Sequence, residues 1–125
     1  MGTGSVGTAL RDRLRKITAT QSEIAAQEVQ TQCAGRGAVT ITACRVGHEV
    51  SVAGTVRSVR LAPLAGAPTF EVELWDGSGT VRLVFLGRRT VRGLVAGRTL
   101  LATGRLTKRD GRMTIFNPRY EIIAA

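Results

Sequence analysis

Positively charged side chains and a few aromatic rings are the residues of this chain that could bind a ligand. Cations neutralise phosphate groups and flat rings stack on nucleobases, so the two together predict a surface that binds a nucleic acid strand. Trp75 is the single tryptophan, and residues 108–112 supply three cations within one short stretch. The candidate nucleic-acid-binding residues are Arg57, Arg60, Trp75, Arg82, Arg105, Lys108, Arg109, Arg112 and Phe116.

Some of these residues also have a purely structural interpretation. Trp75 could cover one mouth of a barrel or pack beneath an N-terminal helix. Arg82 belongs to a stretch that pairs with Glu71 and Glu73, and a cross-strand ion pair explains it as well as a phosphate contact does. The two glutamates also place negative charge on the face that would meet phosphate. The sequence leaves both interpretations open.

Residues suited to catalysis or metal binding are scarce. His48 is the only histidine, and Cys33 and Cys44 are the only cysteines, which is too few ligands at too wide a spacing for a zinc site. No Gly-rich phosphate loop of the Walker type is present, and surface solvation explains Glu71 and Glu73. We therefore predict no enzymatic activity, no metal and no cofactor, and we expect both cysteines to be small apolar packing residues.

The overall charge favours an anionic partner. Lysine and arginine number 18 against 9 acidic residues, for a net charge of +9. Residues 45–125 carry most of the excess, with 13 basic and 6 acidic residues. Such a balance predicts nucleic acid as the first partner, and an acidic membrane surface or protein as the second. The excess of arginine over lysine is also typical of a genome of high GC content.

Membrane insertion and secretion are not predicted. No apolar run is long enough to span a bilayer, and the N-terminal residues lack the apolar core of a signal peptide. We expect a cytoplasmic protein without a membrane partner.

The chain is organised around residues 50–61, VSVAGTVRSVRL, which read as one long strand. Val50, Val52 and Val56 share a face, and then the apolar positions change phase to Val59 and Leu61. Gly54 lies inside this strand, which suggests a bulge or sharp bend where one strand serves two sheets.

Two hairpins follow. Residues 70–75 alternate apolar and polar, a tight turn spans 76–79, and residues 81–85 return. Residues 87–97 are predicted to form a short helix or turn. Residues 99–106 resume the alternation, Asp110 and Gly111 mark a second turn, and residues 112–116 form a fifth strand. Tyr120, Ile122 and Ile123 are expected to fold back and seal the barrel.

The N-terminal part has helical spacing instead. Leu10, Leu14 and Ile17 lie on one stripe, and a second helix is predicted over residues 22–33. We interpret residues 1–45 as a helical N-terminal extension and lead-in, and residues 46–125 as the barrel domain. The helices are expected to pack on the barrel, or to bind a protein partner or a second copy of the chain.

This order of elements predicts a fold with an all-β core: a five-stranded OB-fold Greek-key barrel with an N-terminal helical extension. An SH3-like barrel is the alternative. An OB-fold binds oligonucleotides across its second and third strands, between the first-to-second and fourth-to-fifth strand loops.

Four stretches also resemble a known family: VAGTV at 52–56, LWDGSGTVRLVFL at 74–86, GRTLLATG at 97–104 and IFNPRYE at 115–121. Over residues 40–123 the chain is similar to OB-fold domains of the tRNA/helicase type. These include anticodon-binding domains of class II aminoacyl-tRNA synthetases, the wedge of bacterial branch-migration helicases and stand-alone OB-fold proteins of high-GC bacteria. The resemblance implies the fold and nucleic acid binding, and no reaction.

Two functions are compatible with these observations. The first is a small nucleic-acid-binding module for single-stranded DNA or RNA, which contacts mainly phosphates and has little sequence preference. The second is a protein-interaction adaptor that docks on a larger nucleic-acid-processing or translation assembly.

Overall fold

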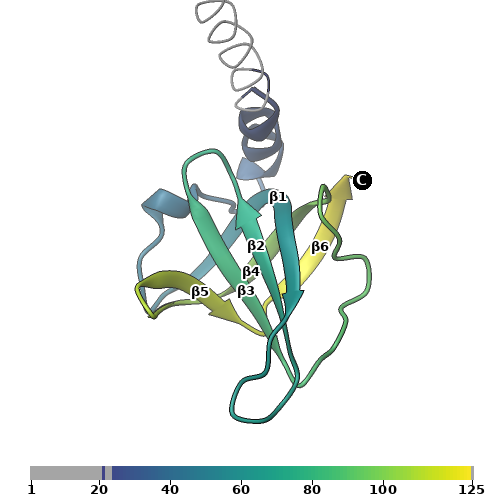
Figure 1. Cartoon of the computed structure of the whole chain (residues 1–125). Helices are drawn as coiled ribbons and strands as arrows, with labels where there is room; N and C mark the ends of the chain where they lie inside the picture. The colour runs from purple at the N-terminus through teal and green to yellow at the C-terminus, as the bar shows by residue number, and fades with distance from the viewer. Residues whose placement is uncertain (1–20, 22–23, 125) are drawn as a thin grey trace, which may run out of the picture.

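The computed structural model describes residue 21 and residues 24–124, and Figure 1 shows the course of the chain. Residues 24–34 are helical, and a short 3-10 helix η1(Ile41–Ala43) follows. Six strands make up the remainder: β1(Glu49–Leu61), β2(Thr69–Trp75), β3(Thr80–Leu86), β4(Thr99–Arg109), β5(Arg112–Phe116) and β6(Arg119–Ala124).

The first five strands close into a barrel. Their hydrogen-bonded order is β1-β2-β3-β5-β4, and β4 pairs back with β1. β3 and β5 run parallel, whereas the other pairs are antiparallel. The predicted five-stranded Greek-key barrel with an all-β core is confirmed.

β1 takes part in both halves of the barrel. Residues 49–55 pair with β4, and residues 55–61 pair with β2. The register shifts between Val56 and Ser58, so Arg57 is the extra residue of a β-bulge. The predicted long strand with a break in phase is confirmed.

Gly54 lies where β1 passes closest to the end of β2. A Cβ atom at this position would lie 2.5 Å from the carbonyl oxygen of Trp75. The backbone cannot move aside as a flexible side chain can, so only glycine fits at this close contact between β1 and β2.

Alternate side chains fill the barrel as the pattern predicted. The buried residues on the hairpin are Phe70, Val72, Leu74, Val81, Leu83 and Phe85. Val59 and Leu61, by contrast, are 36% and 57% exposed, since β4 pairs only with the first part of β1.

The link between β3 and β4 consists of turns without a helix. Val91 and Leu94 are nevertheless buried in the core. Gly93 and Gly97 have positive φ values of 79° and 93°, a conformation that interrupts helical geometry. Of the two predicted alternatives, the turn is the one observed.

The C-terminal tail forms a sixth strand that was not predicted. β5 and β6 pair in succession with β4, and Asn117 turns the chain between them. The backbone N–H of Asn117 donates to the carbonyl of Val84 at 2.7 Å. The side-chain Oδ1 of Asn117 accepts from the backbone N–H of Leu86 at 2.9 Å. Tyr120 seals the core as predicted, with its ring edge-on to Phe85 at 5.9 Å between centroids.

The helical segment 24–34 meets the outside of the barrel at its C-terminal end and extends away from it (Figure 1). Cys33, Ala53 and Leu101 form a small buried cluster there, against which Val29 and Ile123 pack. Val29 and Cys33 therefore pack against the barrel, whereas Ile24 is 52% exposed, and binding of a partner by the helix stays a prediction. The helix predicted around Leu10 and Leu14 lies outside the described residues, and the division at residue 45 stays a prediction.

Asp76 connects the lead-in to the β2–β3 turn. Asp76 is 1% exposed, and its carboxylate accepts from the amide of Ile41 at 2.7 Å and from the amide and hydroxyl of Ser78 at 2.9 and 2.7 Å. The amide of Gly79 also donates to it, at 3.0 Å. Burial raises the pKa of the nearby Cys44 thiol, and the charge of Asp76 raises it further.

An exposed ion pair joins the end of the helical region to β6. Arg36 donates to both carboxylate oxygens of Glu121. The hydrogen bond and the charge of Arg36 lower the pKa of the Glu121 carboxyl.

Candidate nucleic-acid interface

A groove of about 600 Å³ crosses the outer face of the barrel. β2 and β3 form its floor, β1 forms one side, and the tip of the β4–β5 hairpin forms the other. This is the surface where the strand order predicted a binding site. Its lining residues are Ser58, Arg60, Glu71, Val72, Glu73, Thr80, Arg82, Gly111, Arg112 and Met113.

The bulge at Arg57 determines which residues of β1 reach this groove. Without the extra residue, the alternation of β1 would continue unchanged past Val56. With it, Ser58 lies opposite Glu73 and Arg60 lies opposite Glu71. The phase change at residues 56–59 was the sequence signal for this, but it does not identify the partners across the strand.

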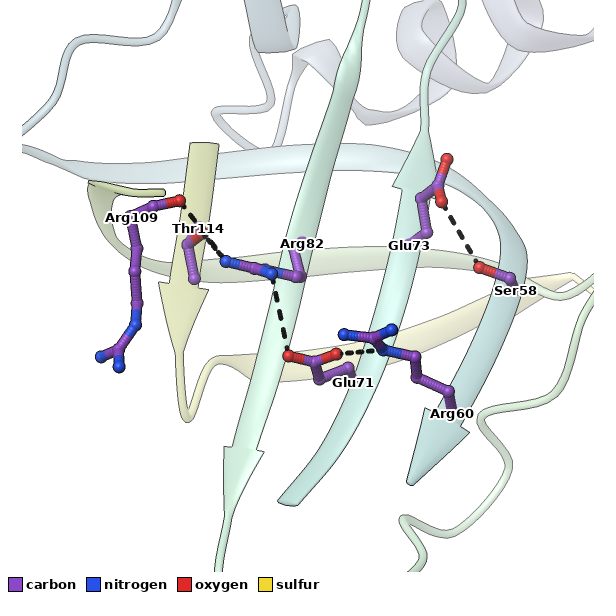
Figure 2. A network of polar contacts seen from close by, with 7 residues as sticks. All are labelled: Ser58, Arg60, Glu71, Glu73, Arg82, Arg109 and Thr114. Carbon is purple, nitrogen blue, oxygen red and sulfur yellow. Dashed lines mark hydrogen bonds and ion pairs between the residues drawn. The ribbon is translucent and has the colours of Figure 1, made fainter. Parts of the chain in front are cut away.

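The floor of the groove carries a charge network (Figure 2). Arg60 donates to Glu71 from one side, and the Nη1 atom of Arg82 lies 3.8 Å from Glu71 on the other. Glu73 is bound more weakly, by the Ser58 hydroxyl at 3.4 Å. The ion-pair interpretation of Arg82 is therefore the arrangement observed.

Arg82 lies flat on the barrel rather than projecting from it. Its side chain is 16% exposed, and its Nη2 atom is 3.5 Å from the carbonyl of Arg109 and 3.4 Å from the hydroxyl of Thr114. The Nε atom is buried without a hydrogen-bond partner among the described residues. These contacts are long, so the guanidinium is held loosely by its acceptors.

Trp75 and Arg57 form a unit beside the groove. The guanidinium carbon of Arg57 lies 4.0 Å from the centroid of the Trp75 ring, a cation–π contact. Trp75 is half-buried and follows Glu73 on the same face of β2. The ring does not belong to the buried core cluster.

The β4–β5 hairpin carries the predicted cluster of cations. Lys108, Arg109 and Arg112 are exposed, and positive φ values at Asp110 and Gly111 form the turn between them. Among the described residues, none of these three cations has a carboxylate within 4.0 Å.

The other predicted residues lie away from the groove lining. The ring of Phe116 is half-buried, with the guanidinium of Arg109 at 5.7 Å from its centroid. Arg105 is exposed on β4, opposite Glu49 at the start of β1. The structure thus gathers Arg60, Arg82 and Arg112 in the groove, places Arg57 and Trp75 beside it, and leaves Arg105 outside.

Sequence reasoning missed the five uncharged lining residues, namely Ser58, Val72, Thr80, Gly111 and Met113. Their side chains give no charge or ring signal, so only the strand register could have identified them. Three arginines and two glutamates line the groove, which leaves one net positive charge there.

Clusters of potential metal ligands and membrane-spanning helices are absent from the part of the chain that the structure describes. Residue 21 and residues 24–124 hold no cluster of three or more potential metal ligands. Within the same residues, no helix has the length and apolarity needed to cross a membrane.

Comparison with known proteins identifies the fold. Residues 50–123 match the family described as OB-fold nucleic acid binding domain. A search of curated proteins finds no match.

Two of the solved structures that are similar to this chain show the fold. RecG bound to a three-way DNA junction aligns with a TM-score of 0.59 and 20% identity, over 72% of this chain and 13% of that one. The replication factor A related protein from Methanobacterium thermoautotrophicum aligns with a TM-score of 0.52 and 18% identity, over 69% of this chain and 90% of that one. This chain therefore spans only a small part of the length of RecG.

Proposed function

The chain belongs to the family of OB-fold nucleic acid binding domains, and from that premise we propose that it binds single-stranded DNA or RNA along the groove over β2 and β3. Binding is mainly to phosphates, with little sequence preference. The function is binding without catalysis.

One observation supports this proposal above the others: cations without a carboxylate partner among the described residues flank the groove. Arg57 stands next to Trp75 on the β1 side, and Arg112 lines the groove on the hairpin side. Lys108 and Arg109 extend the cationic surface along the hairpin. A strand crossing the groove would meet positive charge on both sides, which is what a phosphate backbone requires.

The preference for a single strand follows from the ring. A base can stack on Trp75 only when it is unpaired and free to turn toward the protein. Low sequence preference follows from the cations, since phosphate contacts position a strand without reading its bases.

A titration tests this function. Short labelled DNA and RNA strands of unrelated sequence, with duplexes of the same sequences as the comparison, would be added at several salt concentrations. Because Trp75 is the only tryptophan, its intrinsic fluorescence reports the same event from the protein side. We expect single strands to bind more tightly than duplexes, similar affinities for unrelated sequences, and an affinity that falls steeply with salt.

The result also separates the two candidate functions. A chain that binds neither strand nor duplex at low salt is not a nucleic-acid-binding module, and the adaptor function then replaces it. Self-association through the N-terminal residues, which the sequence suggests, is tested by sedimentation of the full chain with and without oligonucleotide.

A further inference from the structure

Glu71 is the centre of the charge network in the groove (Figure 2). Arg60 contacts one of its carboxylate oxygens from β1, and Arg82 faces the other oxygen from β3. A carboxylate between two guanidinium groups resembles the two non-bridging oxygens of a phosphodiester, because both present a pair of oxygens that arginine can bind.

Neither arginine is fully satisfied by this carboxylate. The side chain of Arg60 is 67% exposed, so most of its donors face solvent. Arg82 meets Glu71, Thr114 and the carbonyl of Arg109 only at 3.4–3.8 Å, and its Nε atom has no acceptor among the described residues. Both guanidinium groups can therefore accept a stronger anionic partner.

We propose that Glu71 is a built-in competitor of the nucleic acid backbone, an inference that rests on the proposed function. Before binding, its carboxylate holds Arg60 and Arg82 over the floor of the groove. A phosphate of the incoming strand then displaces the carboxylate and takes its place between the two guanidinium groups. Glu71 thus lowers the affinity for every strand and does not select among sequences.

The exchange is feasible at the closer of the two contacts, because the Arg60 side chain is 67% exposed and water can solvate it when it separates from Glu71. The Arg82 and Glu71 side chains are 16% and 14% exposed, so the phosphate must supply the contacts that the carboxylate gives up. Displacement moves one side chain and leaves the strands of the barrel in place.

Glu73 is a matched control on the same strand face. It lies two residues from Glu71, lines the same groove and carries the same charge, but no arginine pairs with it among the described residues. General repulsion of phosphate would act from both glutamates. Competition for Arg60 and Arg82 acts only from Glu71.

The experiment compares Glu71→Gln and Glu73→Gln in the full chain, with one labelled single strand titrated at several salt concentrations and thermal melts confirming the fold. Glu71→Gln removes the attraction between the carboxylate and a guanidinium group about 4 Å away, which the phosphate must otherwise break, and so predicts an increase in affinity of about fivefold or more. We expect the slope of log K against log salt concentration to steepen by about 0.7 for each additional phosphate that the released arginines neutralise. Glu73→Gln is expected to increase the affinity by less than half as much.

A third variant, Glu71→Asp, separates competition from repulsion. Aspartate keeps the negative charge but is too short to reach both arginines. Competition predicts tighter binding than in the parent protein, whereas simple repulsion predicts no increase. This variant also keeps the inference testable if Glu71→Gln does not fold.

The outcomes distinguish the inference from the function. Equal increases for Glu71→Gln and Glu73→Gln, or no increase for Glu71→Asp, overturn the inference and leave the proposed function standing. Weaker binding by Glu71→Gln also overturns it. If the parent protein and all variants bind no strand at low salt, the function and the inference both fail.

Discussion

The guanidinium of Arg57 lies over the ring of Trp75, with its central carbon 4.0 Å from the ring centroid. The bulge in β1 creates this relationship, since Arg57 is the extra residue between Val56 and Ser58. A charge that can bind phosphate and a ring that can stack on a base are thereby placed side by side.

Substituting Trp75 and Arg57 one at a time is expected to separate base stacking from phosphate binding. Trp75→Ala removes the stacking surface, so it is expected to weaken single-strand binding by about 1–3 kcal/mol with little change in salt dependence. Arg57→Gln removes a phosphate contact, so it is expected to flatten the salt dependence by about 0.7. Fluorescence anisotropy of a labelled strand across a salt series measures both quantities.

The control is the stability of each variant, because Trp75 also covers part of the outer face of the sheet. Thermal melts must show an intact barrel before the affinities are compared. If Trp75→Ala leaves the affinity unchanged in a folded protein, no base stacks there.

The hairpin cations provide a second test. Changing Lys108, Arg109 and Arg112 together to serine is expected to flatten the salt dependence by about two units, if each contacts one phosphate of a single strand. The loss of affinity is expected to be similar for unrelated sequences. The same salt series with two unrelated strands measures both effects.

The matched control removes the same number of positive charges from the β3–β4 link. Arg88, Arg89 and Arg92 in the β3–β4 link are also exposed, and their replacement by serine removes three charges away from the groove lining. We expect this variant to flatten the slope less than the hairpin variant. Equal slopes would show that the net charge of the protein, and not the hairpin, determines binding.

A third prediction concerns the crossing of β1 and β2. Gly54→Ala would place a Cβ atom 2.5 Å from the Trp75 carbonyl oxygen, so it is expected to cost about 3 kcal/mol of unfolding free energy through overpacking. Gly66→Ala meets no atom within 4 Å but has a φ of +81°, and it is expected to cost about 1 kcal/mol through backbone strain. Urea unfolding of the two variants gives the comparison. Equal costs would mean that the strands can move apart at Gly54.

A fourth prediction concerns the buried carboxylate of Asp76. Asp76→Asn would turn an amide donor toward backbone amides that now donate to the carboxylate, so a loss of about 3 kcal/mol is expected. Ser78→Ala removes only the hydroxyl contacts to Asp76 and to the amide of Thr42, at a cost of about 1 kcal/mol. Denaturant midpoints measure both. A smaller loss for Asp76→Asn than for Ser78→Ala would contradict the role of the carboxylate.

Local patterns in the sequence predict most of the barrel. Alternation over residues 70–75 and 81–85 gives the first hairpin, because apolar side chains at every second position must share a face. The change of phase after Val56 gives the bulge. Asp110 and Gly111 mark the second hairpin by their turn preference.

Contacts between distant segments could not be predicted in the same way. β6 is short and follows Asn117 and Pro118, and its pairing depends on a free edge of β4 formed by residues 99–103. The pairing of Glu71 with both Arg60 and Arg82 depends on the register of three strands at once. Sequence alone therefore identified the charged groups of the groove without showing that Arg60 and Arg82 share one carboxylate.

The double pairing of β1 has a consequence for the kinetics of folding. Thr55 pairs with Trp75 in β2 and with Thr99 in β4, and Glu49 pairs with Arg105 near the end of the chain. Closing such distant pairs costs loop entropy before the contacts form, which places barrels of this kind in the millisecond-to-second range of refolding times. During synthesis, residues 49–54 are made before their β4 partners at residues 100–105. The nascent chain can form the β2–β3 hairpin early, but β1 stays half-unpaired until residues 99–105 of β4 have been made.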